Sequence, residues 1–552
     1  MLKQDLHNAI SKALGSADFT LLYPRDKAFG DFAVNIHQLK KLGLSNEELL
    51  AKFRSIDMFE SVELVDTFIN MFVSKKLLIN EANFVHEKLD SYGKIAQTSP
   101  LRIMLEYGTP NTHKLPHIGH LFSYIYGESM ARILEWSGNT LFRDNYQGDV
   151  GLHVAKCLYI VLTKQNEMES LKTLNDKIRF LQESYQEGSV AYDTNPLAKE
   201  AINQINKKIY QQDSSIADLW KETRSWSIEY YEQFEKRLGV NLHRHYFESE
   251  TSGPGIKVVN ENIGKIFEES EGAVVFKGEK YGLHTRVFLT KQGTPTYEAK
   301  DLGLVTLKRN EGVFDKIIIT TASEQNSYWK VVIKATELIF PDLEGKVMHI
   351  GFGLIDLKGG KMSSRTGNII SGIGLIEQIT EQVKEKLFAE TTQDENIINT
   401  VAMGAIKYAF LKSEARKNMY FDIEQSVSIH GNSGPYLQYT YARLKSIIEK
   451  APEGIEALVE CDKILTDEDA AILRLIPRFS EAVLDAANSY SPHLLCNYLF
   501  ELAQLCNALY DKQNILKAED EIKKMRLSII SAASQVLKNG LYLLGIEVLE
   551  RI

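Results

Sequence analysis

Two histidines separated by two residues are the strongest chemical signal in the sequence. They lie in the stretch Pro110-Asn111-Thr112-His113-Lys114-Leu115-Pro116-His117-Ile118-Gly119-His120. An apolar run over 101–105 precedes this stretch and predicts a buried strand, and apolar residues from 121 to 134 are spaced for one helix face. A helix N-terminus offers free N–H groups to a phosphate, Gly119 permits close approach, and imidazoles donate to phosphoryl oxygens. The stretch favours phosphate chemistry, although two surface histidines near a turn have the same pattern.

A second polar segment is suited to the far end of a polyphosphate. It reads Gly360-Lys361-Met362-Ser363-Ser364-Arg365-Thr366-Gly367-Asn368 and follows a strand-like run at 347–354. It is short, bracketed by glycines and carries two cations, as expected of a loop that covers a nucleotide. Taken alone, it also fits an ordinary solvated turn. It lies about 240 residues after the histidines, so the fold must bring the two segments together.

Strand and helix signals alternate through the middle of the chain. The strand-like runs lie at 101–105, 274–276, 287–289, 317–319 and 347–354, the segment 140–151 carries a further strand and the loop leaving it, and a helix is expected at 296–309. This alternation predicts a mostly parallel sheet covered by helices. A polar and mostly helical segment over 156–245 interrupts it, and the pattern is helical from 376 to the end.

Residues 1–95 carry a mixed pattern. Strands are expected at 19–23 and 62–73, and helices at 33–42, 46–53 and 75–92. This pattern predicts a small α+β domain ahead of the parallel sheet.

Several polar residues are predicted to meet at the carboxyl edge of the parallel sheet, where such sheets bind ligands. Glu106 ends the first strand and Asn111 lies in the loop after it, while Gln325 follows the strand at 317–319. Tyr297 and Asp301 are four residues apart on a predicted helix and so share one face. Two carboxylates, a tyrosine and two amides suit an amino acid with a cationic side chain. Guanidinium is the best match because its planar fork pairs with carboxylates, although either acid alone could be an ordinary surface residue.

The composition is that of an ordinary globular protein of three or four domains. The 552 residues are 44% apolar and 25% charged. No apolar run approaches the roughly 18 residues of a membrane span, and the start lacks the apolar core of a signal peptide. Cys157, Cys461, Cys496 and Cys506 show no metal-binding spacing and are expected to be reduced cytosolic thiols. A net charge of −9 argues against a generic polyanion binder but allows a local basic track.

The two polar segments together resemble the HIGH and KMSKS signatures of class I aminoacyl-tRNA synthetases. Further elements resemble the arginyl-tRNA synthetases within that class: Glu106-Tyr-Gly-Thr-Pro-Asn111, Asn145-Tyr-Gln-Gly-Asp-Val-Gly151, Tyr297-Glu-Ala-Lys-Asp301, Gln325-Asn-Ser-Tyr328, Gly431-Asn-Ser-Gly-Pro-Tyr-Leu-Gln-Tyr439 and Gly30-Asp-Phe-Ala-Val-Asn35. The chain departs from the family pattern at Thr109, Tyr146, Val150 and Tyr328. None of these departures removes an expected guanidinium ligand.

The resemblance implies a role for each site residue. His117, Gly119 and His120 would contact the transition-state phosphate, with Lys114, Lys361 and Arg365 as further catalytic residues. Glu106, Tyr297 and Asp301 would bind the arginine guanidinium, and Asn111 and Gln325 its amino-acid end. Met362, Ser363 and Ser364 would join the histidine motif in binding ATP, and Asn35, Tyr436, Gln438 and Tyr441 would contact tRNA. Ser364 stands where KMSKS has a second lysine, and we expect Lys114 to supply that charge from the other side of the phosphates.

The expected fold is α/β, with a Rossmann-type catalytic domain at 96–375 and a helical insertion at about 160–245. An α+β add-on domain that binds the tRNA elbow is expected at 1–95, and an all-α anticodon-binding bundle at 376–552. The implied partners are tRNA(Arg), L-arginine and ATP accompanied by Mg²⁺. No tightly bound protein metal and no membrane contact are expected, and the protein would be a cytoplasmic monomer.

Rival functions make different demands on the site. A cysteine-specific synthetase would need zinc thiolates near the site, and Cys157 has no suitable partner nearby. A glutamate-specific or glutamine-specific synthetase is the other enzymatic alternative, and glutamate would call for cations in place of Glu106 and Asp301. A catalytically silent tRNA-binding paralogue would not need both histidines and Lys361.

Overall fold

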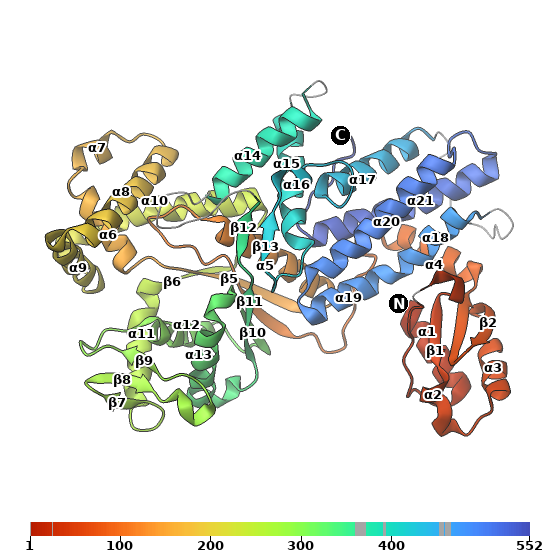
Figure 1. Cartoon of the computed structure of the whole chain (residues 1–552), viewed down its shortest axis with the longest axis horizontal. Coiled ribbons are helices and arrows are strands. Elements are labelled where there is room, and N and C mark those ends of the chain that lie inside the picture. The colour runs from red at the N-terminus through yellow and green to blue at the C-terminus, as the bar shows by residue number, and fades with distance from the viewer. Residues whose placement is uncertain (1, 25, 359–370, 390–393, 452–457, 459–464) are drawn as a thin grey trace. The chain divides into compact units, whose positions relative to one another are not determined.

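The computed structural model of the chain describes residues 2–24, 26–358, 371–389, 394–451, 458 and 465–552. These residues form two compact units (Figure 1). One spans Ala96–Val427, and the other combines the two ends of the chain, Met1–Ile95 and Ser428–Ile552. The first unit therefore extends beyond 375, where the sequence analysis ended the catalytic domain.

A five-stranded parallel sheet forms the centre of the 96–427 unit. Its strands are β4 (Arg102–Glu106), β5 (Thr140–Gln147), β6 (Arg244–Phe247), β10 (Lys316–Ala322) and β11 (Val347–Phe352). They lie in the order β11-β10-β4-β5-β6. The chain moves outward from β4 to one side and then returns to build the other side, so the order reverses between β4 and β10. That switch point is where a parallel sheet offers a ligand site.

Two predicted strands do not belong to the parallel sheet. The runs at 274–276 and 287–289 lie in β8 (Ala273–Phe276) and β9 (Arg286–Leu289), which pair antiparallel with β7 (Glu268–Ser270). The reason is the length of their connections, because a short turn can only join antiparallel neighbours and a parallel pair needs a long crossover.

Helices connect and cover the sheet strands. The helix α5 (Ile118–Trp136) links β4 to β5, and α13 (Asn326–Ile339) links β10 to β11. Between β6 and β10 lie α11 (Glu248–Glu261) and α12 (Tyr297–Asn310), which confirms the helix predicted at 296–309. α11 and α12 pack antiparallel, because a Cβ atom on Gly255 would lie 2.1 Å from the Ala299 carbonyl oxygen and one on Gly303 would lie 2.1 Å from that of Thr251.

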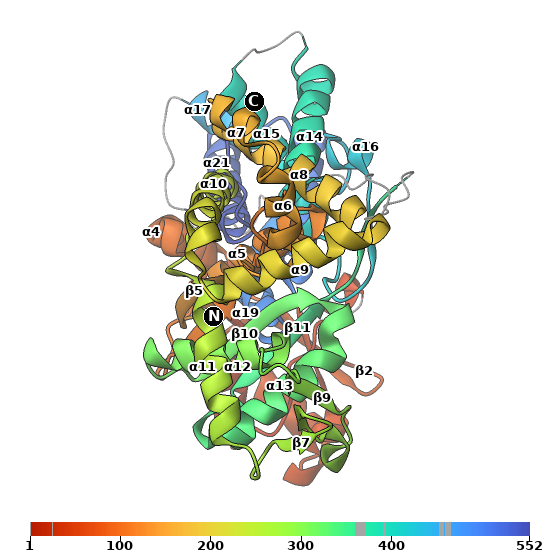
Figure 2. The same cartoon turned by 90° about the vertical axis from the view of Figure 1, so that its left-hand side faces the viewer.

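The polar segment between β5 and β6 is helical, as predicted. It consists of α6 (Leu152–Val161), α7 (Gln165–Ser170), α8 (Leu174–Thr194), α9 (Pro196–Tyr210) and α10 (Ser214–Leu238) (Figure 2). It has its own apolar core, in which Val154 and Leu158 pack with Ile202, Ile209 and Ile216. We call these helices the insertion.

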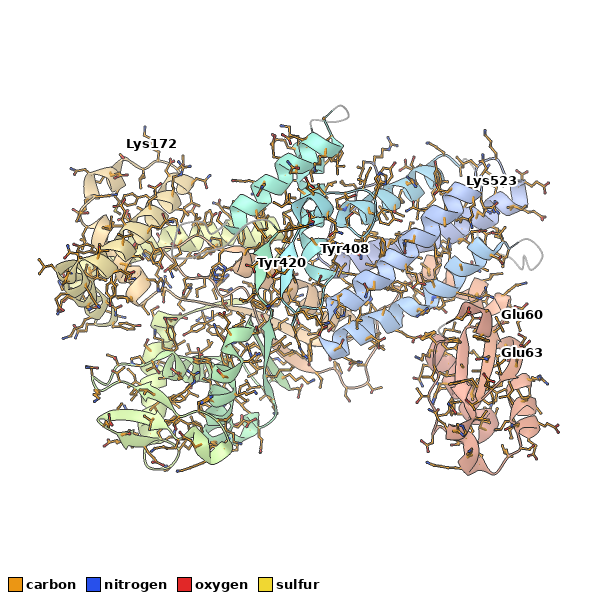
Figure 3. The ribbon with its side chains drawn as sticks, in the orientation of Figure 1. Glu60, Glu63, Lys172, Tyr408, Tyr420 and Lys523 are labelled. Carbon is orange, nitrogen blue, oxygen red and sulfur yellow. The ribbon has the colours of Figure 1, made fainter. Side chains whose placement is uncertain are left out.

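The last part of the 96–427 unit follows β11. It contains the parallel strand pair β12 (Ile355–Leu357) and β13 (Met419–Phe421), and the helices α14 (Gly372–Leu387), α15 (Glu395–Leu411) and α16 (Ile423–Ser426). Tyr408 is buried within α15, whereas Tyr420 on β13 is 73% exposed (Figure 3).

The amino-terminal part of the other unit is the predicted α+β domain, with three differences. The strand predicted at 62–73 is two antiparallel strands joined by a turn at 66–67. It contains α1 (Leu2–Leu14), β1 (Phe32–Asn35), α2 (Ile36–Leu39), α3 (Asn46–Arg54), β2 (Phe59–Val65), β3 (Phe68–Val73) and α4 (Lys75–Lys88). The start of the predicted helix at 33–42 is strand β1, because Phe32–Asn35 pair with β3. The strand predicted at 19–23 is reduced to an isolated bridge between Leu22 and Ala33.

The carboxyl-terminal part is a helical bundle. It contains α17 (Gly434–Glu449), α18 (Asp467–Leu475), α19 (Phe479–Ser489), α20 (Pro492–Lys512) and α21 (Asp520–Leu543). Short 3₁₀ turns also occur along the described chain, at Lys27–Phe29, Lys40–Leu42, Leu89–Ser91, Gly278–Tyr281, Ser323–Gln325, Pro341–Leu343 and Ile476–Arg478.

Among the described residues, no helix has the length and apolar character needed to cross a membrane.

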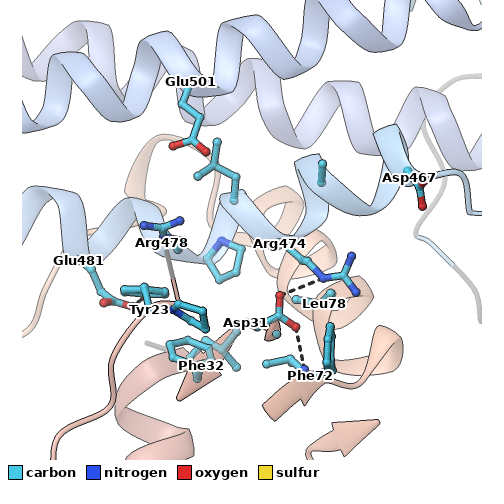
Figure 4. A pocket seen from close by; sticks show the side chains of 17 residues that line it. Tyr23, Asp31, Phe32, Phe72, Leu78, Asp467, Arg474, Arg478, Glu481 and Glu501 are labelled. Atoms are coloured by element: carbon cyan, nitrogen blue, oxygen red, sulfur yellow. Dashed lines mark hydrogen bonds and ion pairs between the residues drawn. The ribbon is translucent and has the colours of Figure 1, made fainter. Parts of the chain in front are cut away.

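The two parts of this unit meet around a cavity of about 470 Å³ (Figure 4). Asp31 of the amino-terminal part pairs with Arg474 of α18 at 2.9 Å, and the Tyr23 hydroxyl donates to Glu481 of α19 at 2.6 Å. Arg478 lies over the Tyr23 ring. Polar contacts in the lining of this cavity thus join the two ends of the chain, between residues more than 400 positions apart in the sequence.

The packing of α5 against the end of β4 generates a stability prediction. A Cβ atom on Gly127 would lie 2.1 Å from Cγ of Tyr107, and the Tyr107 ring is fixed by its hydroxyl, which donates to Glu128 at 2.8 Å. We expect Gly127→Ala to lower the free energy of unfolding by about 1–3 kcal/mol, as overpacking does. Urea unfolding measures this effect, with Ser225→Ala on an exposed face of α10 as the neutral control. A Gly127→Ala variant as stable as the wild type would contradict the proposed fit.

Candidate active site

His117 and His120 lie at the start of α5, directly after the loop that leaves β4. His117 is the N-cap of this helix. The two rings stack with centroids 3.7 Å apart. Gly119 lies under the His117 ring, since a Cβ atom there would come within 2.9 Å of Cε1 of His117. The sequence prediction of paired imidazoles at a helix N-terminus is confirmed.

Backbone hydrogen bonds fix which nitrogen of each ring faces outward. The Gly119 N–H donates to Nδ1 of His117 at 3.1 Å. The His117 N–H donates to Nδ1 of His120 at 3.2 Å. Because both Nδ1 atoms accept, a neutral ring must carry its proton on Nε2. Each histidine therefore presents an N–H donor away from the helix.

Both rings are neutral at physiological pH. Desolvation by the surrounding protein, followed by the charge of Lys114, lowers the pKa of His117 to about 4, although the side chain keeps an exposed edge. Burial lowers the pKa of His120 well below its usual value, with further contributions from His117 and Lys114. Two neutral donors beside a lysine form a site that attracts an anion without exchanging protons with it.

The carboxylate of Asp301 has no basic partner among the described residues. Asp301 is 7% exposed and accepts a hydrogen bond from the Tyr328 hydroxyl. Burial raises its pKa well above the usual value, and the nearby charges of Glu106 and Glu248 raise it further. A buried acid in an acidic surrounding requires a cation to ionise fully. The position therefore fits a cationic ligand group.

Glu106 is paired within the protein. The ammonium of Lys308 lies 2.5 Å from Oε2 of Glu106 and 2.7 Å from Oδ2 of Asp144, and all three side chains are almost fully buried. Lys308 belongs to α12, as does Asp301, so this contact ties the helix to the ends of β4 and β5. The cation that contacts Oε2 of Glu106 here is Lys308. Guanidinium binding by Glu106 stays a prediction.

Glu248 is a pocket residue that the sequence analysis missed. It starts α11, is buried, and its Oε2 lies 2.7 Å from Nζ of Lys300. Its charge reaches Asp301, Tyr297 and Tyr146, whose pKa values it helps to raise. The available sequence signal was weak: one acid among several between 248 and 261.

Asn111 and Gln325 lie on loops at the carboxyl edge of the sheet. Asn111 forms a parallel bridge with Gly148, and a Cβ atom on Gly148 would lie 2.2 Å from Oδ1 of Asn111. Gln325 is exposed, and its amide oxygen accepts from Thr321 at 3.1 Å and from Trp329 at 3.3 Å. Tyr297 is 66% exposed at the first turn of α12. Asn111 follows β4 and Gln325 follows β10, so both lie next to the switch point between these two strands.

Comparison with known proteins decides the family. The family model "tRNA synthetases class I (R), catalytic domain" matches residues 84–423, more than half of the chain. The model "Arginyl tRNA synthetase N terminal domain" matches residues 1–73, and "DALR anticodon binding domain" matches 437–552. The chain belongs to the arginyl-tRNA synthetase family.

Relatives and solved structures agree with this family. The chain is 28% identical to the arginine–tRNA ligase of Clostridium acetobutylicum over 96% of this chain and 95% of the relative. It is 29% identical to that of Bacteroides thetaiotaomicron, over 89% and 87%. The fold is similar to the arginyl-tRNA synthetase of Thermus thermophilus, with a TM-score of 0.81, 22% identity and full coverage of both chains. It is also similar to that of Plasmodium falciparum, with a TM-score of 0.78, 22% identity and coverage of 100% and 98%. The predicted class I fold is confirmed.

The family's second signature lies outside the described residues, and so do the predictions for Lys361, Met362, Ser363, Ser364 and Arg365. The structure resumes at Ser371, which forms a β-bridge with His117, while the N–H of Gly372 donates to the Pro116 carbonyl at 2.7 Å. The chain therefore returns to the histidine motif directly after the signature.

Lys114 lies in the loop between β4 and α5. Its ammonium lies 4.6 Å from the centre of the Tyr185 ring, which belongs to α8 of the insertion. Its charge lowers the pKa values of His117 and His120. The structure thus places Lys114 beside the histidine motif.

The four residues expected to contact tRNA differ in accessibility. Tyr436 and Asn35 are partly exposed, and Asn35 caps α2 through its Oδ1. Gln438 is fully buried and its Nε2 donates to the Glu547 carbonyl at 2.8 Å. Tyr441 is also buried. Burial within the helical bundle argues against direct tRNA contact by Gln438 and Tyr441.

Class I synthetases use ATP. Within the described parts of the chain, no group of three or more His, Cys, Asp or Glu side chains is arranged to hold a metal ion. Cys157, Cys496 and Cys506 are buried free thiols, and Cys461 lies outside the described residues.

The loop ahead of the histidine motif generates a pH prediction. His113 is fully buried between Thr112 and Thr223, and burial lowers its pKa to about 3. The unfolded chain binds a proton near pH 6.5 and the folded chain does not, so stability falls as the pH drops from about 6.5 towards 3. Between pH 7 and 5, this group should cost about 2 kcal/mol.

Urea unfolding of the wild type and of His113→Gln at both pH values measures this contribution. The wild type should lose about 2 kcal/mol more than the variant on going from pH 7 to 5. Comparing the two losses cancels the effect of any hydrogen bond that glutamine fails to make. Equal losses would show that His113 is already protonated in the folded protein.

Proposed function

We propose that this chain ligates arginine to tRNA(Arg) in two steps at the β4–β10 switch point. In the first step, an arginine carboxylate oxygen attacks the α-phosphorus of ATP and pyrophosphate leaves, which gives arginyl-adenylate. In the second step, a ribose hydroxyl of the 3′-terminal adenosine attacks the carbonyl carbon, AMP leaves and the hydroxyl proton is released. The observation that carries this proposal is a buried carboxylate without a basic partner, Asp301, in the same unit as two neutral histidine donors.

The histidine motif would stabilise the α-phosphate. As negative charge grows on the phosphoryl oxygens, the outward Nε2–H groups of His117 and His120 donate to them. Gly119 lets the phosphate approach the start of α5, whose dipole also favours an anion. Because both rings are neutral beforehand, they act by electrostatic stabilisation and transfer no proton.

The acidic pocket would bind the arginine side chain. Asp301 pairs with the guanidinium, and Tyr297 and Glu248 complete the wall. Asn111 and Gln325 hold the α-amino and carboxylate end, which places the carboxylate between this pocket and the histidine motif. Glu106 and Lys308 keep α12 and its Asp301 in place. Arginine is thereby held at both ends for in-line attack.

Cations would complete the ATP site. Lys114 supplies charge from the histidine side, and Lys361 and Arg365 of the second signature hold the pyrophosphate end together with Met362, Ser363 and Ser364. Mg²⁺ arrives bound to the ATP phosphates, since it keeps most of its water and needs few protein ligands.

We assign tRNA binding to residues 1–95, for the elbow, and to the carboxyl-terminal helical domain, for the anticodon. Asn35 and Tyr436 are the predicted contacts that keep exposed surface. The protein would act as a monomer in the cytoplasm, where its tRNA and ATP substrates are found.

The first test concerns the chemical step. His120→Ala removes one donor to the phosphate and should slow adenylate formation by about 10²-fold or more. ATP–pyrophosphate exchange with saturating arginine, ATP and tRNA measures the rate. His120→Gln, whose amide can place an N–H near the former Nε2, should recover part of the loss, whereas the arginine KM should stay unchanged in both variants. A wild-type rate in His120→Ala would remove His120 from the mechanism.

The second test concerns specificity. Asp301→Asn keeps the shape of the side chain but removes its charge, and losing one partner of a buried charge pair costs about 2–5 kcal/mol. The arginine KM should rise accordingly while the ATP KM barely moves. Lysine should be rejected by the wild type, because an ammonium does not match a fork-shaped site.

Glu298→Gln is the matched control for this test. Glu298 lies on the same helix and is buried, but it pairs with Arg286 at 3.1 Å. Its arginine KM should stay within about threefold of wild type. Equal rises in the arginine and ATP KM values of Asp301→Asn, or efficient charging with lysine, would refute the pocket assignment.

A further inference from the structure

Lys300 lies inside the wall of the arginine pocket, held by side chains from three helices. It is 4% exposed. Its Nζ donates to Oε2 of Glu248 at 2.7 Å and to the Tyr210 hydroxyl at 2.8 Å. The same ammonium lies 5.1 Å from the centre of the Tyr297 ring and 5.2 Å from that of Tyr210. Its position is therefore fixed by one carboxylate, one hydroxyl and two aromatic faces.

The contact with Lys300 determines how the Glu248 carboxylate is oriented. Lys300 holds Oε2, so the other oxygen, Oε1, is turned towards Gly148. A Cβ atom on Gly148 would lie 3.5 Å from Oε1 of Glu248 and 2.2 Å from Oδ1 of Asn111. The free oxygen of Glu248 and the Asn111 side chain thus converge at one glycine on the substrate side of the pocket.

We propose that Lys300, supported by Tyr210 of the insertion, is a positioning residue that orients Oε1 of Glu248 towards the α-ammonium end of the arginine substrate, beside Asn111. This inference rests on the proposed function. Lys300 occupies an unspecified position of the Tyr-x-x-x-Asp element, and Tyr210 lies at the last residue of α9, so neither residue belongs to the signature motifs. Through this pair, the insertion takes part in building the amino-acid pocket.

The charge of Lys300 also favours the ionised form of Glu248. Burial raises the pKa of Glu248, and Lys300 is the largest opposing influence. Asp149 raises the pKa of Glu248 further and Lys114 lowers it. The other titratable groups that interact with Glu248 are Tyr146, Tyr210, Tyr297 and Asp301. Without Lys300, Glu248 becomes a buried acid close to other acids, and it takes up a proton from solvent at neutral pH.

The decisive variant is Lys300→Met, which keeps the length of the side chain and removes its charge. In tRNA-supplemented pyrophosphate exchange at pH 7, its arginine KM should rise at least tenfold, while kcat and the ATP KM stay within threefold of wild type. Between pH 6.5 and 8.5, the variant KM should fall as the pH rises and Glu248 ionises. The wild-type KM should be flat over the same range. Lys300→Arg keeps the charge and should restore the flat profile.

Tyr210→Phe provides a second route to the same answer if Lys300→Met fails to fold. It removes the hydroxyl but keeps the ring against Lys300, and it should raise the arginine KM about threefold with no change in the ATP KM. Tyr192→Phe is the matched control, because Tyr192 belongs to the same insertion and its hydroxyl donates to Asn203 instead. The control should keep the wild-type KM.

The outcomes separate this inference from the proposed function. A wild type without arginine-dependent exchange would overturn the proposed function itself. An active wild type together with a Lys300→Met variant of normal, pH-independent arginine KM would overturn the role of Lys300 alone. A lowered melting temperature with an unchanged KM would make Lys300 purely structural, and a wild-type KM in Tyr210→Phe would remove the insertion from the pocket.

Discussion

The candidate site depends on the free-energy cost of burying carboxylates at the carboxyl edge of the parallel sheet. A buried carboxylate is tolerated only when a cation or several hydrogen bonds match it. Asp149 is matched by Arg224 and Ser249, Glu106 and Asp144 by Lys308, and Glu248 by Lys300. Among the described residues, Asp301 is left with a tyrosine hydroxyl alone. In the proposed function, an arginine side chain supplies the cation that Asp301 lacks among the described residues, and the substrate completes the charge balance of the pocket.

The histidine motif follows the opposite electrostatic logic. Around it lie a helix N-terminus and Lys114, and the rings avoid adding further charge by staying neutral. The Nδ1 atom of each ring accepts a hydrogen bond from a backbone N–H, which leaves the Nε2–H group available to donate to a ligand. A region suited to anions and a region suited to cations thus lie in one unit. A substrate with a cationic side chain and a reactive carboxylate, combined with a nucleotide, requires both.

The sequence predicts those parts of the fold that depend on local pattern. The sequence correctly predicts β4, α5 and the part of α12 that carries Tyr297 and Asp301. These elements could be predicted because hydrophobic periodicity and turn residues depend only on neighbouring positions in the sequence. Pairing partners were less accessible. The runs in β8 and β9 resembled buried parallel strands until their short connections determined an antiparallel sheet. Strand β1 was hidden in a helical pattern because β3, more than 30 residues later, decides its conformation.

The candidate site shows the same division. The histidines and Asp301 stand in short motifs with distinctive spacing and could be named from the sequence. Lys308 could not be matched to Glu106, because the two are 202 residues apart and meet only once the sheet has formed. Glu248 and Lys300 were missed for the same reason. Residues in short motifs can be named from the sequence, whereas the partners that hold them in place are set by tertiary contacts.

The discontinuous unit has a consequence for biosynthesis. Residues 1–95 pack with residues 428–552, whereas the intervening 332 residues form a unit of their own. At about 5–20 residues per second, the ribosome finishes residues 428–552 roughly 20–90 s after it has translated residue 95. During that interval the catalytic unit can fold alone, while the amino-terminal domain keeps its Tyr23 and Asp31 face open to water. Residues 428–552 therefore complete this unit last. A chain that terminates before them leaves the face around Tyr23 and Asp31 exposed.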